Sequence, residues 1–155
     1  MENDNRFQRG AILYFEPFIF LDGGKPKPKY FIVLTHIDNT LLLASLPTTK
    51  DSLPAYLEKH HGCINIPEIN LNCYYFSPQY IICDNGFSFP IETYVYGFRL
   101  QLFDMENFIQ QEQQEHITIT QKGILLDKEY NALVKCLSKS ASVKRKFRKI
   151  LTFTN

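Results

Sequence analysis

The amino-acid sequence predicts an α+β fold, in which a small barrel or strongly curved antiparallel sheet is followed by C-terminal helices. Short segments rich in β-branched and aromatic residues fill the first hundred residues, whereas helical patterns begin only at about residue 104. The 155 residues are 45% apolar and 14% aromatic, which is typical of one packed domain. We therefore expect a single domain over residues 1–155, mainly β from residue 9 to 103, with residues 1–8 flexible.

Six segments are predicted to form strands because they are short, apolar and bounded by Gly, Pro, Asn or Asp. They are residues 10–20, 30–37, 40–47, 63–67, 79–84 and 92–103. Asp38 and Asn39 separate the second segment from the third and predict a tight hairpin there. Because many short strands precede the helices, we expect a small, strongly curved sheet that helices flank.

The chain from residue 104 onward is predicted to form a helix, one more strand and two helices. Residues 104–115 predict a short helix, residues 117–123 a strand, and residues 127–138 a helix that Asp127 caps. Four apolar side chains of this last helix recur at i, i+3, i+4 and i+7, namely Tyr130, Leu133, Val134 and Leu137. This spacing places them on one face, so we expect the helix to pack on the sheet.

Basic charge is concentrated near the C-terminus. Residues 139–149 contain six of the 17 Lys and Arg and no acid, although the whole chain has a net charge of only +1. Ser140 or Ser142 is predicted to cap a final helix that runs to about Leu151. Its apolar strip comprises Val143, Phe147, Ile150 and Leu151, and its cations are Lys144, Arg145, Lys146, Arg148 and Lys149. We expect these cations to contact RNA or an acidic protein rather than lipid, the alternative being a solvated charged face.

The cysteines and the apolar runs bound the location of the protein. Cys63, Cys73, Cys83 and Cys136 form no CxxC pair, so reduced, mostly buried thiols are expected. The spacing of His60, His61, Cys63 and Cys73 fits no usual zinc motif, and neither a metal nor a cofactor is predicted. Since no apolar run approaches the length that spans a bilayer and the N-terminus is too polar for a signal peptide, we expect a cytoplasmic protein without a membrane contact.

Residues 23–30, "GGKPKPKY", alternate lysine with proline just before an apolar segment. Proline fixes φ and stiffens the chain, and lysine supplies charges suited to phosphate. Lys25, Lys27 and Lys29 are therefore predicted to form an extended contact for a polyanion. The alternative is that the lysines only solubilise an edge and protect the next strand from edge pairing.

The order of these segments resembles the PemK/MazF toxin family, whose members are small ribonucleases built on an SH3-like barrel. The resemblance rests on Arg9-Gly10-Ala11 at the first strand, Lys29-Tyr30 where Arg-Pro is usual, residues 32–35 in the next strand, and Pro47-Thr48-Thr49. It covers roughly residues 9–50, with a looser match through residues 97–103 and the helical C-terminus. Asp22 is the acid nearest to the place where the family often carries one. The resemblance implies an SH3-like barrel, a homodimer and an antitoxin partner.

Metal-independent RNA cleavage needs a proton acceptor, a cation at the phosphate and a donor for the leaving oxygen. We expect Lys29 to be the cation, Thr49 (or Thr48) to donate to a phosphate oxygen, and His60 (or His61, but not both) to shuttle protons. Arg99 is a further candidate for phosphate binding. The alternatives are a turn role for the threonine and a structural role for the histidine. The predicted function is a toxin-like, metal-independent endoribonuclease acting on single-stranded RNA, and the alternative is a non-catalytic SH3-like barrel module that binds nucleic acid or a protein.

Overall fold

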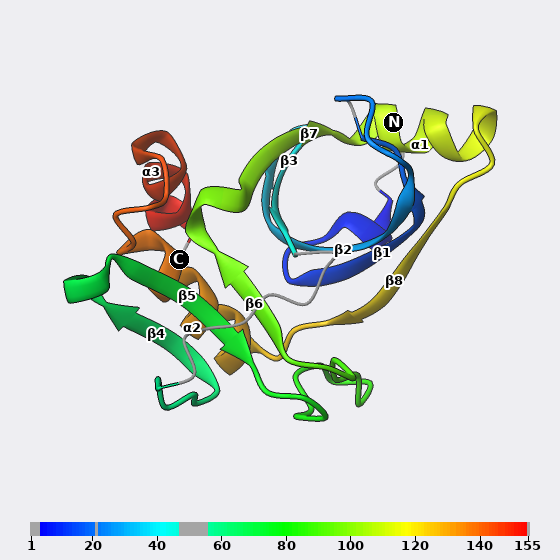
Figure 1. The fold of residues 1–155 in the computed structure, drawn as a ribbon. Helices are drawn as coiled ribbons and strands as arrows, with labels where there is room; N and C mark the ends of the chain where they lie inside the picture. Colours follow the sequence, from blue (N-terminus) through cyan, green and yellow to red (C-terminus); the bar gives the residue numbers. More distant parts are fainter. Residues whose placement is uncertain (1–3, 21, 47–55, 155) are drawn as a thin grey trace.

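The residues that the structure describes fold into two antiparallel sheets and three α-helices (Figure 1). The computed structural model describes residues 4–20, 22–46 and 56–154. The larger sheet has the strand order β7 (Leu100–Asp104), β3 (Thr40–Ser45), β2 (Lys27–Ile37), β1 (Ala11–Phe18) and β8 (Thr118–Ile124). The smaller sheet consists of β4 (Gly62–Ile66), β5 (Leu71–Phe76) and β6 (Thr93–Tyr96). The helices are α1 (Met105–Gln114), α2 (Asp127–Ser138) and α3 (Arg145–Thr154). The predicted α+β class is confirmed.

The larger sheet is strongly curved, as Figure 1 shows, and it is covered on both faces. Alternate residues of β2 belong to different clusters: Phe31 and Val33 pack with Phe108 of α1, whereas Ile32 and Leu34 pack towards α2 and α3. Burial on both faces explains why the strand is apolar almost throughout rather than at every second residue.

The tight hairpin after β2 is confirmed. Ile37 pairs with Thr40, and the two residues between them form the turn. Asp38 has a φ of 52°, in the left-handed region that Asp and Asn tolerate better than most residues. The identity of these turn residues therefore fixes the register of β2 with β3.

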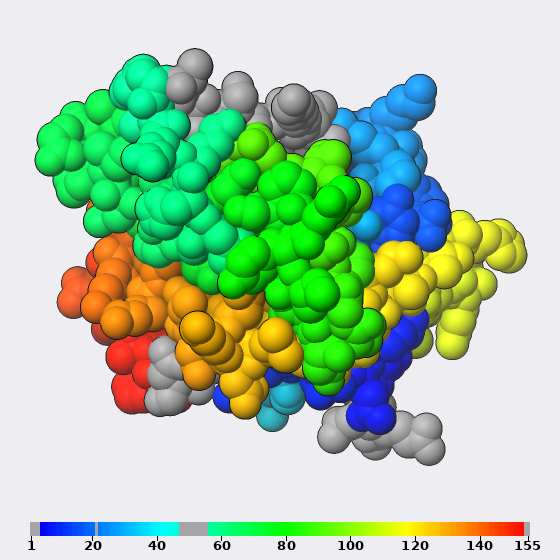
Figure 2. All heavy atoms as spheres, turned by 90° about the horizontal axis from the view of Figure 1, so that it is seen from below, coloured from blue at the N-terminus to red at the C-terminus, as the bar shows by residue number. Residues whose placement is uncertain are grey.

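One predicted strand is wrong: residues 79–84 form a loop. Ile82 and Cys83 are buried, yet the only strand-like pairing of this segment among the described residues is an isolated bridge from Cys83 to Leu125. The amide of Ile82 donates to the carbonyl of Phe87 instead. Figure 2 shows the loop (green) lying directly against the start of α2 (gold), where the Leu126 amide donates to the Ile82 carbonyl. Only Ile82 and Cys83 of this segment are buried, whereas Tyr80 and Ile81 are exposed, so its apolar composition is that of a strand although it forms none.

Two further differences concern strands. Residues 71–76 form β5, which the sequence analysis did not predict, and residues 92–103 do not form one strand. The short turn η3 (Gly97–Arg99) divides this segment, so that β6 belongs to the small sheet and β7 to the curved sheet. A Cβ on Gly97 would lie 2.6 Å from Cγ2 of Val143, so no larger residue fits at this division.

The predicted packing of α2 is confirmed. Its four spaced apolar residues are all buried, and the Tyr130 hydroxyl donates to the Leu34 carbonyl of β2 at 2.5 Å. Burial raises the pKa of Tyr130 to about 12. The predicted cap differs, because Asp127 is the first helical residue and the preceding Leu126 makes no side-chain capping bond.

The final helix α3 begins at Arg145, and its predicted apolar strip packs inward. Val143, Phe147 and Leu151 are buried, and Ile150 is partly buried. The two serines that were expected to cap α3 instead hydrogen-bond to each other at 2.8 Å in the turn before it. Among the described residues, no helix is both long and apolar enough to cross a membrane.

The N-terminal residues, which were expected to be flexible, are anchored from Asp4 onward. The Arg6 guanidinium forms ion pairs with Asp4 and with Glu112 of α1, each at 2.7 Å. The acidic partners raise the pKa of Arg6 and, together with hydrogen bonding, Arg6 lowers the pKa of Asp4. Phe7 is buried beside Phe108. These contacts join the start of the chain to α1.

The prediction of four reduced cysteines is wrong for two of them. Cys63 of β4 and Cys136 of α2 form a disulfide across 73 residues of sequence, because the helix packs on the small sheet. Cys73 and Cys83 are free and buried, as expected, and burial raises their pKa values to about 11 and about 12. Disulfides are rare in cytosolic proteins, so this bond does not support the expected cytoplasmic location, which stays a prediction.

Reduction of this disulfide should lower the free energy of unfolding by about 2–4 kcal/mol, because the crosslink constrains a long loop of the unfolded chain. The measurement is urea unfolding of the purified protein with and without a phosphine reductant. Cys63→Ala is the control, since Cys63 is exposed and this variant has no crosslink to lose. An equal effect of the reductant on both proteins would contradict the prediction.

Candidate functional site

A hollow of about 230 Å³ lies at the edge of the curved sheet where β1 ends. It is lined by Phe18, Phe20, Asp22, Gln101 and Phe103. Three aromatic rings therefore share one small opening with a carboxylate and an amide. Phe18 is only 7% exposed, whereas Phe20 and Phe103 are partly exposed, and accessible aromatic faces stack nucleic-acid bases with little regard to sequence.

An irregularity in β1 directs its last aromatic residue to this hollow. Phe15 pairs with Lys29 and Phe18 pairs with Lys27, so two residues of β1 lie opposite a single residue of β2. Without such a bulge, Phe15 and Phe18 would point to opposite faces, since side chains alternate along a strand. With it, their rings lie 5.4 Å apart on the same face.

Lys29 is a buried cation beside the hollow. It is only 8% exposed, and its Nζ lies 5.4 Å from the ring centre of Phe20 and 5.9 Å from that of Phe31. Burial lowers the pKa of the Lys29 ammonium, and the nearby charges of Arg99 and Lys27 lower it further. The ammonium is thus a stronger acid than that of an ordinary lysine.

Two more cations accompany Lys29. Lys27 Nζ lies 6.0 Å from the ring centre of Phe20, and Arg99 is close enough to act on the pKa of Lys29. The buried Nε of Arg99 has no hydrogen-bond partner, and its guanidinium lies over the ring of Phe98. None of the three cations forms an ion pair within the described part of the chain. We call Lys27, Lys29 and Arg99 the Lys29 cluster.

The three lysines of the predicted polyanion contact do not lie in one exposed segment. Only Lys25 lies before β2, where it is exposed, whereas Lys27 and Lys29 are residues of the strand itself. Lys29 is buried rather than exposed because it alternates with Tyr30 and shares the face of Phe31. Of the predicted phosphate ligands, the structure brings together Lys27, Lys29 and Arg99.

The predicted histidine lies elsewhere. His60 is exposed, precedes β4 of the small sheet, and contacts the carbonyl of Cys63 through Nε2 at 3.2 Å. Lys29 belongs to the curved sheet, so the fold does not place the two residues in one site. The role of His60 as a proton shuttle stays a prediction.

The neighbouring His61 is fully engaged by the protein. Its Nδ1 accepts from the Ser77 amide at 3.1 Å, which leaves the proton on Nε2, and Nε2 contacts Glu129 at 2.5 Å. The Tyr74 hydroxyl donates to the same Glu129 oxygen, and the Tyr80 ring stacks on the imidazole at 3.8 Å. Because both ring nitrogens have partners, His61 joins β4, β5 and α2 rather than offering a free acid or base.

The remaining predicted site residues are two threonines and the C-terminal cations. Thr48 and Thr49 lie outside the described residues. The five cations near the C-terminus lie in α3 or just before it. None of them lines the hollow. No group of three metal-binding side chains occurs within residues 4–20, 22–46 and 56–154.

Comparison with known proteins gave no match to a family model, a curated protein or a solved structure. The resemblance to the PemK/MazF family therefore stays a prediction. The site residues that sequence reasoning missed are Phe18, Phe20, Gln101 and Phe103. The aromatic residues at the end of segment 10–20 were a visible signal, whereas nothing in the sequence placed residues 101 and 103 beside them.

Proposed function

We propose that the protein binds single-stranded RNA at the hollow and cleaves it there without a metal ion. One observation carries the proposal: Lys27 and Lys29 lie against the ring of Phe20, which lines the same hollow as Asp22, and the charge of Arg99 is close enough to act on Lys29. Phosphate neutralises cations and aromatic faces stack bases, which is the combination that proteins use to hold single strands. Following the resemblance, we also propose a homodimer that an antitoxin restrains.

The electrostatics of the cluster favour an anion. Three cations lie together, and burial makes the charge of Lys29 costly in the free protein. A bound phosphate would favour the charged form of Lys29 and supply the acceptor that Arg99 Nε lacks. Binding of a phosphate would therefore lower the electrostatic free energy of the Lys29 cluster.

The groups at the hollow also fit the chemistry of cleavage. In this proposal Asp22 takes the proton of the RNA 2′-hydroxyl, the 2′-oxygen attacks phosphorus, and the bond to the 5′-oxygen breaks. Lys29 stabilises the negative charge that develops on the phosphate and donates its proton to the leaving 5′-oxygen. Asp22 and Lys29 form no ion pair in the described structure, so both are available to the substrate.

The second candidate is a binding module without catalysis. It is favoured because His60, the expected proton shuttle, precedes the small sheet and does not line the hollow, where, among the described residues, the exposed Asp22 is the one titratable lining residue. In this version the same cations and rings hold RNA, and no proton is transferred.

Incubation of the purified protein with a labelled single-stranded RNA in EDTA should give cleavage products. A bound but intact strand would support the binding module instead, and the absence of both binding and cleavage would contradict both candidates.

Arg99→Gln should weaken binding of RNA and lower the slope of log K against log salt by about one, since one phosphate contact is lost. Lys128→Gln removes the same charge from an exposed site on α2 and should leave the slope unchanged.

A further inference from the structure

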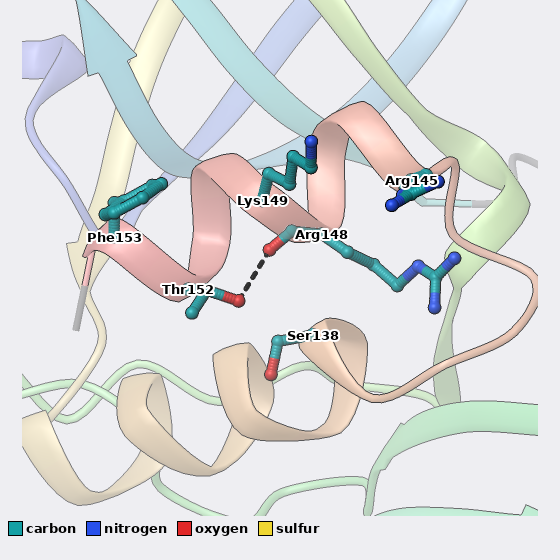
Figure 3. Close-up of a pocket in the computed structure, with 6 residues that line it drawn as sticks. All are labelled: Ser138, Arg145, Arg148, Lys149, Thr152 and Phe153. Atoms are coloured by element: carbon teal, nitrogen blue, oxygen red, sulfur yellow. Dashed lines mark hydrogen bonds between the residues drawn. The ribbon is translucent and has the colours of Figure 1, made fainter.

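A second basic groove lies between α2 and α3, apart from the hollow (Figure 3). It has a volume of about 450 Å³ and is lined by Ser138, Arg145, Arg148, Lys149, Thr152 and Phe153. In Figure 3 the Arg148 side chain extends through the space between the two helices, and Arg145 lies at the same end. Phe153 lies at the other end and is 89% exposed.

The cations of this groove have no partner in the described part of the chain. Arg145, Arg148 and Lys149 form no ion pair there, and the buried Nε of Arg148 has no hydrogen bond. A guanidinium presents several donors in a planar fork that matches the oxygens of a phosphate. The groove therefore offers two guanidinium groups to an anion at one end, and Lys149 adds a third positive charge to its lining.

The structure divides the five basic residues of the C-terminal segment into two groups. Lys144 and Lys146 do not line the groove; their Nζ atoms lie 5.9 Å and 5.1 Å from the ring centre of Phe147. The sequence alone assigned one role to all five cations. Of the five, only Arg145, Arg148 and Lys149 line the groove.

We propose that the α2–α3 groove is a nucleotide site, in which Arg145, Arg148 and Lys149 bind a phosphate and Phe153 stacks on the adjoining base. The two ends of the groove match the two ends of a nucleotide, anionic at one and aromatic at the other. The inference rests on the proposed function only in taking RNA as the source of this nucleotide. A free mononucleotide has the same chemistry.

The test uses amide chemical shifts of the full-length protein titrated with adenosine 5′-monophosphate, adenosine or inorganic phosphate. We expect the monophosphate to shift amides of residues 138–153, inorganic phosphate to shift those near Arg145 and Arg148, and adenosine to act only weakly. Arg145→Gln/Arg148→Gln should weaken monophosphate binding by about tenfold or more, because charge-assisted hydrogen bonds are lost. Phe153→Ala should remove the difference between the monophosphate and inorganic phosphate.

The matched control is Lys144→Gln/Lys146→Gln, which removes the same charge from outside the groove. Equal weakening in the two double variants would overturn the site, since charge alone would then explain binding. Arg145→Gln/Lys149→Gln changes only exposed side chains and serves if the loss of Arg148 unfolds the protein. Shifts that stay in this groove when Lys29 is replaced would support the inference even if the hollow binds nothing. A single-stranded RNA that shifts no groove amide, although the monophosphate does, would assign the site to free nucleotides.

Discussion

Lys29→Met should give a protein that is more stable than the wild type and nearly inactive on RNA. Loss of one preorganised cation at a reacting phosphate lowers the rate by about a hundred- to a thousand-fold. Methionine suits the space beside Phe20 and Phe31, because its thioether packs well against aromatic rings. Stability rises because the variant no longer holds a buried ammonium. The measurements are initial rates of cleavage in EDTA and urea unfolding at pH 7.

The pH dependence of unfolding provides a further check of Lys29. Its pKa is lower in the folded protein than in the unfolded chain, where the ordinary value is 10.5. Between these two values the unfolded chain binds more protons, so the stability of the wild type should rise with pH there. Lys29→Met should lack this rise, and the exposed control Lys128→Met should keep it. A variant less stable than the wild type at pH 7 would contradict the burial argument.

Asp22→Asn should lower the rate of RNA cleavage by about a hundred- to ten-thousand-fold while leaving RNA affinity at least as strong. The loss is that expected for a positioned general base. Asp22 Oδ1 accepts from the Gly24 amide at 2.9 Å, and the amide oxygen of asparagine can accept the same bond. The variant should therefore retain the conformation of the loop, while it lacks the carboxylate that takes the proton. The measurements are single-turnover rates and fluorescence anisotropy with a non-cleavable RNA.

The control for this variant is Asp84→Asn, which neutralises another exposed carboxylate on the loop between β5 and β6. It should cleave RNA at the wild-type rate. If Asp22→Asn also cleaves at that rate, the proton acceptor is a different group. If both variants gain affinity equally, the gain comes from net charge rather than from the hollow.

The parts of the fold that follow from local patterns could be predicted from the sequence. The face of α2 was predicted because its apolar residues recur with the helical period, and the Asp38 turn because few residues accept its backbone conformation. The loop at residues 79–84 was mistaken for a strand because its two buried residues, Ile82 and Cys83, pack against the start of α2, which lies far along the chain. The disulfide was missed for the same reason, since it follows from the packing of α2 on β4.

The candidate site was predictable in part. Lys29 and Arg99 were singled out for their charge, and the fold brings them together. The hollow itself depends on the bulge that turns Phe18 and on the break at Gly97 that sends β7 to the curved sheet. Both are tertiary features with no periodic signature. The division of the C-terminal cations into two groups likewise required the position of α2.

The close approach at Gly97 sets the distance between the two basic regions. The turn that carries Arg99 packs through Gly97 against Val143 and the serines that precede α3. Because this packing connects the turn that carries Arg99 to the turn before α3, we expect the hollow and the groove to keep a fixed separation. An RNA strand that binds at both places, as proposed, would therefore span a fixed length. The protein would then protect a footprint of constant size, whatever the sequence of the strand it holds.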